Sequence, residues 1–172
     1  FTEPYMYWLV FSAFFYGMAG LLILRKILLQ YFSDRLTAFI LMIVTAGTNL
    51  FYYLTLEAPM SHAYNFFLFL LFAWLTMRWY ERADTKTSIW LGLTYGLIGL
   101  IRPTNGLIAI FFLLFDIRQI GDLKARFFLL FGNWRNILVI AAMAFVVVLP
   151  QLIFWKVNTG SWFFYTYGEE GF

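Results

Sequence analysis

The sequence predicts an all-α, polytopic integral membrane helix bundle that contains a short broken-helix hairpin. Of its 172 residues, 63% are hydrophobic and only 12% are charged, whereas soluble domains carry about 25% charged residues. The mean hydropathy is +0.77, and several apolar segments reach the length of about 20 residues that crosses a bilayer. These observations exclude a soluble globular domain, a disordered chain and a nucleic-acid binder.

Four apolar runs define the predicted membrane spans. They are residues 5–24, 36–56, 62–80 and 136–155. The first run follows Pro4, which suits the first turn of a helix. The last run contains Pro150, which predicts a kink. Residues 1–172 therefore form a single transmembrane region in this prediction.

Residues 88–116 are also apolar, but Arg102 and Pro103 interrupt them. Because proline disfavours helix at the residue before it, the sequence predicts two short helices, 88–101 and 105–116, joined by a tight turn. Each is short for a full crossing. We therefore expect the turn to lie below the membrane surface, facing protein or a water-filled cavity. The first arm also carries a predicted packing face of small residues, formed by Gly92, Gly96 and Gly99.

Two segments are predicted to lie at the membrane surfaces. Residues 122–133 mix charges with Phe and Leu, which is typical of an interfacial helix, and residues 157–172 are aromatic and Gly-rich. If both ends of the hairpin lie on the same side of the membrane, all but two of the twelve Lys and Arg residues lie on that side. The positive-inside rule makes that side cytoplasmic, so 122–133 is predicted to be cytoplasmic and 157–172 extracytoplasmic. Phe1 then lies outside, and we expect an earlier span in a longer chain.

Polar residues on the extracytoplasmic side are the candidates for a site. Ionisable groups in a bilayer are costly, at roughly 2.5–3.5 kcal/mol for a charge at a helix centre. Asn49, Tyr53 and Glu57 are spaced i, i+4, i+8, so we expect them to share one face of the second span. His62 and Asn65 follow at the start of the third span.

Arg102 is the charged centre of this predicted site, and its planar donor fork suits phosphate. Ser61 and Thr104 are predicted to cap two helices that start on the same side, where helix N-termini carry partial positive charge. Together these groups predict an anion site at the level of the outer headgroups. Asn105 and Gln151 lie on the same side of the membrane in this prediction.

Each candidate also has a purely structural explanation. Glu57 can be a carboxylate of an interfacial loop, and His62 can form a hydrogen bond to a neighbouring helix. Arg102 can be an anchor whose charged end reaches the membrane surface. Asn49 and Asn65 suit hydrogen bonds between helices. The helix break that directly follows Arg102 favours a site role for that residue.

Three stretches of the chain also carry a family resemblance. The first is residues 47–53 with EAPMSHAYNFF at 57–67, the second is GLIGLIRPTN at 96–105, and the third is 150–156 with 159–160 and 167–172. In order and spacing they resemble the bacterial branch of the dolichyl-phosphate-mannose protein mannosyltransferase and aminoarabinose transferase group. Those proteins are integral-membrane glycosyltransferases of the GT-C fold. The resemblance covers nearly the whole chain, but only the middle of such an enzyme.

The resemblance implies a partial GT-C-like fold and the transfer of a sugar from a polyprenyl-phosphate donor to an acceptor. It implies a catalytic role for His62 and a supporting one for Glu57, at a position where the family often has Asp. The catalytic base of the family would lie in a loop before Phe1. The implied ligands of the donor phosphate are Arg102, Thr104 and Asn105. The implied lining of the cavity is Asn49, Tyr53, Ser61, Asn65 and Gln151.

The sequence therefore predicts part of a multi-pass glycosyltransferase of the bacterial inner membrane, with its site facing the extracytoplasmic side. Two alternatives stay open: a non-catalytic subunit that holds a lipid headgroup in the same site, and a transporter fragment, which the broken helix pair favours. With no Cys and one His, no cofactor is assigned, and a divalent metal at the site stays open as well. The expected partners are a polyprenyl-phosphate-sugar lipid, membrane lipids and proteins of a membrane complex, without nucleic acid.

Overall fold

The computed structural model describes residues 3–163, and within them it is helical and contains no strand, which confirms the predicted all-α class. Eight α-helices and one 3-10 helix follow one another along this part of the chain. They are α1 (Glu3–Leu28), α2 (Asp34–Ala46), α3 (Leu50–Thr55), α4 (His62–Glu81), α5 (Thr85–Ile101), η1 (Pro103–Ile108), α6 (Ala109–Leu114), α7 (Asp122–Gly132) and α8 (Trp134–Thr159).

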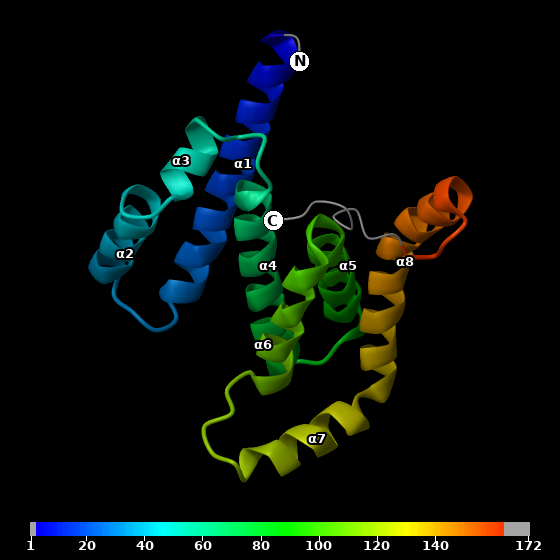
Figure 1. Ribbon diagram of the computed structural model, residues 1–172. Helices are drawn as coiled ribbons and strands as arrows, with labels where there is room; N and C mark the ends of the chain where they lie inside the picture. Colours follow the sequence, from blue (N-terminus) through cyan, green and yellow to red (C-terminus); the bar gives the residue numbers. More distant parts are fainter. Residues whose placement is uncertain (1–2, 164–172) are drawn as a thin grey trace.

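The helices form an open bundle in which α1 packs against α4, α4 against α5, and α5 against α8 (Figure 1). The short helices α2 and α3 lie against α1, and α6 returns alongside α4. α7 lies crosswise below the other helices (Figure 1). The bundle thus has an α7 end, where α1, α4 and α6 terminate, and an η1 end, where α4 begins and α5 terminates (Figure 1).

The larger of two core clusters lies between α4 and α5, and α6 closes one side of it; the smaller lies between α1, α3 and the start of α4. Trp79, Leu91 and Ile98 are at most 1% exposed. The indole N–H of Trp79 donates to the hydroxyl of Ser88 at 2.9 Å, so its burial leaves no polar group unpaired. This contact fixes α5 against α4, and it sets where the far end of α5 lies.

Two glycines allow α5 to approach α8 closely. A Cβ atom at Gly92 would lie 2.4 Å from the carbonyl oxygen of Ile140, and one at Gly96 would lie 2.7 Å from Cβ of Val147. A Cβ atom at Gly99 would meet nothing within 4 Å. The predicted glycine packing face is therefore confirmed for Gly92 and Gly96, and it is wrong for Gly99.

We expect Gly92→Ala to destabilise the protein in detergent, because the added methyl group forces α5 away from α8. Overpacking of this kind costs about 1–3 kcal/mol. Gly99→Ala is the matched control, and we expect it to be neutral or to stabilise by up to about 1 kcal/mol, since alanine favours helix over glycine. Thermal unfolding followed by circular dichroism measures both. Equal melting temperatures for the two variants would contradict the close contact between α5 and α8.

The predicted single span over 36–56 is wrong, because the structure breaks it between α2 and α3. The N–H of Gly47 bonds to the carbonyl of Ile43 at 2.7 Å. The Thr48 hydroxyl donates to the carbonyl of Val44 at 2.6 Å and accepts the N–H of Leu50 at 3.2 Å. Such side-chain bonds to the backbone compete with the helix.

The break also separates residues that were predicted to share one face. Asn49 is the N-cap residue of α3, Tyr53 lies inside that helix, and Glu57 lies beyond its end. The predicted i, i+4, i+8 face is therefore wrong, because it needs a continuous helix through all three residues.

The predicted helix break at Arg102 and Pro103 is present, but the second arm differs from the prediction. It is a 3-10 helix followed by the short α6, where one helix over 105–116 was expected. Thr104 lies inside η1 and caps no helix, so its predicted capping role is wrong. Ser61 does occupy the N-cap position of α4, but its side chain makes no capping hydrogen bond.

Asp84 begins α5 earlier than the apolar run indicates, because its carboxylate accepts the N–H of Thr87 at 2.8 Å. This hydrogen bond is the main reason that the pKa of Asp84 lies below its ordinary value of 3.8; partial burial opposes it. A carboxyl with a lowered pKa stabilises the fold above its unfolded-state pKa, and this contribution is lost as the pH falls through the folded-state pKa.

We therefore expect the wild-type protein to lose stability below about pH 4 more steeply than Asp84→Asn, which keeps an acceptor oxygen but does not titrate. The melting temperature of both proteins as a function of pH measures this difference. The other carboxylates titrate in both proteins, so the difference between the two curves reports on Asp84. Parallel curves would contradict the capping role of the ionised carboxylate.

The C-terminal part of the described chain is dominated by α8. Figure 1 shows the ribbon of α8 changing direction in its orange part, and Pro150 lies inside this helix. α8 ends where Gly160 adopts the left-handed conformation, with φ of 74°, which glycine accepts without strain. Of the predicted extracytoplasmic segment 157–172, the first three residues belong to α8, and residues 164–172 lie outside the described part of the chain.

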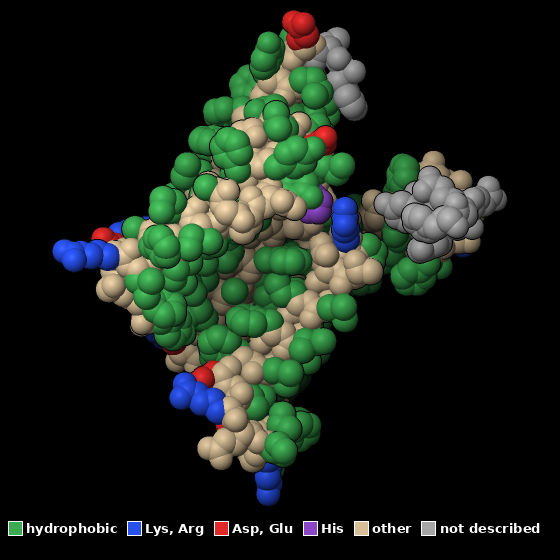
Figure 2. Space-filling view, turned by 60° about the vertical axis from the view of Figure 1, so that its left-hand side comes forward, with side chains coloured by type: hydrophobic (Ala, Val, Ile, Leu, Met, Phe, Trp, Pro, Cys, Tyr) green, Lys and Arg blue, Asp and Glu red, His purple; other side chains and the backbone are tan. Residues whose placement is uncertain are grey.

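Among the described helices, α1 and α8 are long and apolar enough to cross a membrane. Their most apolar 18-residue windows have mean hydropathies of 1.8 and 2.8, and 17% and 0% of those residues are buried. Core helices of soluble proteins reach similar lengths and compositions, but they are mostly buried. Figure 2 shows hydrophobic side chains over much of the visible face, with most Lys and Arg side chains at its lower and left-hand margins.

Candidate functional site

The candidate site lies at the η1 end, where the first turns of α4 meet the helix break after α5. Three elements supply polar side chains there: Tyr53 comes from α3, His62 and Asn65 from α4, and Arg102 and Asn105 from the break and η1. These five residues are called the polar cluster below. A ring contact joins Tyr53 to His62, and hydrogen bonds join Asn105 to Asn65 and Arg102. The first turn of α4, which carries both His62 and Asn65, connects these two groups.

A hydrogen bond between two amides joins α4 to the helix break. The side-chain N–H of Asn105 donates to the side-chain oxygen of Asn65 at 3.2 Å, and both residues are half-buried. The backbone N–H of Asn105 donates to the carbonyl of Arg102 at 2.9 Å. Asn105 therefore fixes the turn locally and also ties it to α4.

The only histidine of the sequence stacks on a tyrosine. The rings of Tyr53 and His62 lie 4.0 Å apart, with an angle of 27° between their planes. The stack orients the imidazole and connects α3 to the first turn of α4. Figure 2 shows the histidine side chain reaching the surface of the molecule.

Arg102 connects α5 to η1 in an extended conformation, with φ of −151° and ψ of 122°. Pro103 imposes this conformation, because its ring excludes helical geometry at the preceding residue. The side chain of Arg102 is exposed, and within the described residues its guanidinium has no hydrogen-bond or ion-pair partner. A free guanidinium fork can bind a phosphate or a carboxylate through two hydrogen bonds.

The structure does not join all the predicted site residues to this cluster. Glu57 lies in the loop between α3 and α4, where it accepts a hydrogen bond from the phenol of Tyr52 at 3.4 Å. Within residues 3–163, the side chains of the remaining predicted residues make no hydrogen bond to the cluster; these residues are Asn49, Ser61, Thr104 and Gln151. The backbone carbonyls of Asn49 and Ser61 do contact it, by accepting the N–H groups of Tyr53 at 3.1 Å and Asn65 at 3.0 Å.

A lateral groove of about 620 Å³ opens beside the cluster, between α1 and α4 on one side and α5 and α8 on the other. Its walls are almost entirely apolar. The groove extends to the η1 end of the bundle, where Ser61 and Ile101 line it. It is lined by Tyr16, Ser61, Tyr64, Phe67, Leu68, Leu71, Trp90, Leu93, Thr94, Leu97, Leu100, Ile101 and Val147. Ser61 precedes His62, and Ile101 precedes Arg102, so the chain itself links the groove to the polar cluster.

Sequence reasoning identified Ser61 but missed the other residues of the groove. Tyr64 is the clearest example, because its phenol lies 2.7 Å from the hydroxyl of Ser12 and its ring packs on that of Tyr16. One signal was present: Tyr16 lies in the middle of an apolar run, whereas membrane tyrosines usually lie near the ends of spans. The apolar residues of the groove carried no signal, since nothing in one sequence shows which faces of two helices enclose a space.

The cluster offers amide, imidazole and guanidinium groups, which suit an anion. Among the described residues, no group of three or more His, Asp or Glu side chains could hold a metal ion. In comparisons with protein-family models, with curated proteins and with solved structures, no match to this chain was found. The family resemblance in the sequence therefore stays a prediction, and the geometry of the cluster is the basis of the functional proposal.

Proposed function

We propose that this chain is part of a bacterial inner-membrane glycosyltransferase that uses a polyprenyl-phosphate-sugar donor on the extracytoplasmic face. One observation carries the proposal: Ser61 and Ile101, which line one end of an apolar groove, directly precede His62 of the polar cluster and Arg102 with its free guanidinium. A lipid-linked phosphate has this same division, with a charged group at the end of a hydrocarbon chain. The groove is of a size for part of such a chain, since ligand sites commonly measure about 300–1,000 Å³.

A membrane location agrees with how the charges are distributed. The two helices that are long and apolar enough to cross a membrane bury few of their side chains, and an exposed apolar surface of this extent needs lipid or protein around it. The basic residues at the ends of α1 and α4 lie at the α7 end, away from the polar cluster. By the positive-inside rule the α7 end is cytoplasmic, and the polar cluster is extracytoplasmic.

In this proposal the acceptor oxygen attacks the anomeric carbon of the sugar as the bond from that carbon to the phosphate oxygen breaks. The leaving polyprenyl phosphate keeps the bonding electron pair, and a carboxylate base takes the proton of the acceptor hydroxyl. Arg102 would stabilise the charge that develops on the phosphate, with help from Asn105. By the family resemblance, the base comes from a loop before Phe1, and Glu57 has a supporting role.

The alternative is a non-catalytic subunit that holds a lipid headgroup in the same place. It is favoured by the chemistry of the cluster, which contains a guanidinium and other groups able to donate hydrogen bonds but no carboxylate. Both functions require the cluster to bind a lipid phosphate. Only the enzyme releases polyprenyl phosphate from the donor in the presence of an acceptor.

The test is therefore made in two steps with the full-length protein in detergent. We expect saturable binding of polyprenyl phosphate, and then release of polyprenyl phosphate from a polyprenyl-phosphate-sugar when membrane acceptors are supplied. Binding without release would favour the scaffold over the enzyme. Absence of binding would contradict both functions.

A further inference from the structure

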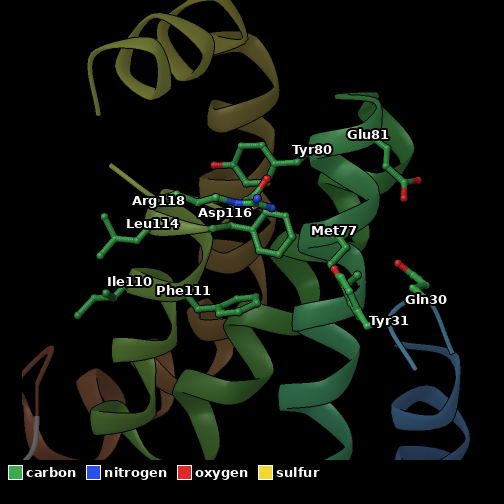
Figure 3. A pocket seen from close by; sticks show the side chains of 11 residues that line it. Gln30, Tyr31, Met77, Tyr80, Glu81, Ile110, Phe111, Leu114, Asp116 and Arg118 are labelled. Carbon is green, nitrogen blue, oxygen red and sulfur yellow. Dashed lines mark hydrogen bonds and ion pairs between the residues drawn. The ribbon is translucent and has the colours of Figure 1, made fainter. Parts of the chain in front are cut away.

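A second pocket, of about 610 Å³, lies at the α7 end of the bundle, opposite the polar cluster. It is enclosed by the turn after α1, the last turns of α4, and α6 with the loop that follows (Figure 3). None of the residues assigned to the proposed glycosyltransferase site contributes to it. The pocket therefore needs its own explanation.

The wall formed by α4, α6 and the following loop changes from apolar to polar toward the α7 end, while Gln30 and Tyr31 from the turn after α1 lie level with its apolar part (Figure 3). Met77, Ile110 and Phe111 line the part nearer the middle of the bundle, and Ile110 and Phe111 are 52% and 42% exposed. Tyr80, Asp116 and Arg118 line the part nearer the end of α4 (Figure 3). A phospholipid in the adjoining leaflet has the same order, with its chains toward the membrane centre and its headgroup toward the end of the bundle.

The carboxylates at the rim already have arginine partners. Glu81 lies 3.9 Å from Arg78, and Asp116 lies 3.0 Å from Arg118. The side chain of Arg118 is 80% exposed, so its guanidinium can still contact a second anion. The backbone N–H groups of residues 118 and 119 donate to the carboxylate of Asp122 at 3.0 Å, which holds the loop that carries Arg118.

Arg126 adds a positive charge that forms no ion pair within the described residues, although, with the backbone N–H groups of residues 118 and 119, it helps to lower the pKa of Asp122. Its guanidinium lies 3.9 Å over the ring of Tyr80 and donates to the carbonyl of Phe115. Its Nε and one terminal nitrogen are buried, and within the described residues they have no hydrogen-bond partner. Because Tyr80 and Phe115 both line the pocket, this charge acts on the pocket through one layer of side chains. Arg118 in the wall and Arg126 behind it therefore give the pocket two guanidinium groups that attract an anion.

We propose that this pocket binds an anionic phospholipid of the cytoplasmic leaflet, with the phosphate at Arg118 and an acyl chain along α6. The inference rests on the membrane orientation of the proposed function. It concerns a different ligand, a different pocket and the opposite face of the membrane. The bound lipid would fasten the turn after α1 to the end of α6.

The experiment is native mass spectrometry of the full-length, delipidated protein in detergent, titrated with dioleoyl phosphatidylglycerol or dioleoyl phosphatidylcholine. We expect one phosphatidylglycerol to bind at least about tenfold more tightly than phosphatidylcholine. Arg118→Gln should weaken phosphatidylglycerol binding about tenfold, the effect of losing one hydrogen bond to a charged group. Lys124→Gln is the matched control, because it removes one charge from the same end of the protein, outside the pocket.

Equal losses of phosphatidylglycerol affinity in Arg118→Gln and Lys124→Gln would overturn the proposal, because they would show only a general attraction of anions to the α7 end. Equal affinity for the two lipids would overturn it as well. Competition by millimolar inorganic phosphate would overturn the lipid as the occupant. If Arg118→Gln does not fold, Leu114→Trp tests the acyl part instead, since Leu114 is 50% exposed and lines the pocket.

The same titrations separate this inference from the proposed function. Leu114→Trp should weaken phosphatidylglycerol binding and leave polyprenyl phosphate binding unchanged, and Leu97→Trp in the lateral groove should do the reverse. If phosphatidylglycerol binds as expected and polyprenyl phosphate does not, only the proposed function fails. If polyprenyl phosphate binds and phosphatidylglycerol binds no better than phosphatidylcholine, only this inference fails.

Discussion

Under the proposed function, Arg102→Ala should lower sugar transfer by the full-length protein at least about a hundredfold, the effect of removing one preorganised donor from a developing negative charge. The side chain is exposed and makes no contact that holds the fold, so expression and helix content should not change. The measurement is the rate of polyprenyl phosphate release at saturating donor.

Two variants make this result specific. Lys156→Ala removes a basic side chain near the end of α8, where it bonds to the carbonyl of Gly160, and it should keep most of the activity. Arg102→Lys keeps the charge but loses the planar fork, so its activity should lie between that of Arg102→Ala and that of the wild type. Wild-type activity in Arg102→Ala would contradict the assignment of the phosphate site.

Leu97→Trp should lower the affinity for a long polyprenyl phosphate about tenfold or more. Leu97 lines the lateral groove and is 44% exposed, so a tryptophan there fills space that the hydrocarbon chain would occupy. Displacing even two methylene groups from an apolar surface costs about 1.6 kcal/mol, which is more than a tenfold change in affinity. Titration of the detergent-solubilised protein measures this loss.

The chain length of the ligand provides the internal control. A phosphate that carries only two isoprene units should bind the wild type and Leu97→Trp with similar affinity if it reaches the polar cluster without filling the groove. Leu138→Trp is the matched variant, because Leu138 is 57% exposed on α8 and does not line the groove. Equal losses in the two tryptophan variants would show that the groove is not the lipid site.

Features that depend on local chemistry could be predicted from the sequence. The apolar runs indicated most of the long helices, and Pro103 fixed the position of the helix break. Arg102 and Asn105 were recognised as candidates because they lie at that break. The structure places Asn105 against Asn65, two residues that are 40 positions apart in the sequence.

Two kinds of feature could not be predicted: helix ends set by side-chain hydrogen bonds to the backbone, and spaces enclosed by the packing of several helices. The end of α2 depends on the hydroxyl of Thr48, which bonds to backbone groups inside a segment that is apolar on average. The lateral groove needs four helices at fixed separations. The position of Arg126 could not be predicted either. In the sequence it is one of several basic residues on the side predicted to be cytoplasmic, but in the structure it packs over the ring of Tyr80.

The 3-10 geometry of η1 has a consequence for the depth of the turn. A 3-10 helix rises about 2.0 Å per residue and an α-helix about 1.5 Å. η1 and α6 have six residues each. Together they are roughly 21 Å long, whereas twelve α-helical residues would be about 18 Å long. The 17 residues of α5 span about 26 Å, less than the hydrocarbon thickness of about 30 Å. In the proposed orientation, a hairpin that starts at the cytoplasmic surface would hold its guanidinium a few ångströms beneath the outer headgroups, where a phosphate must leave water to reach it.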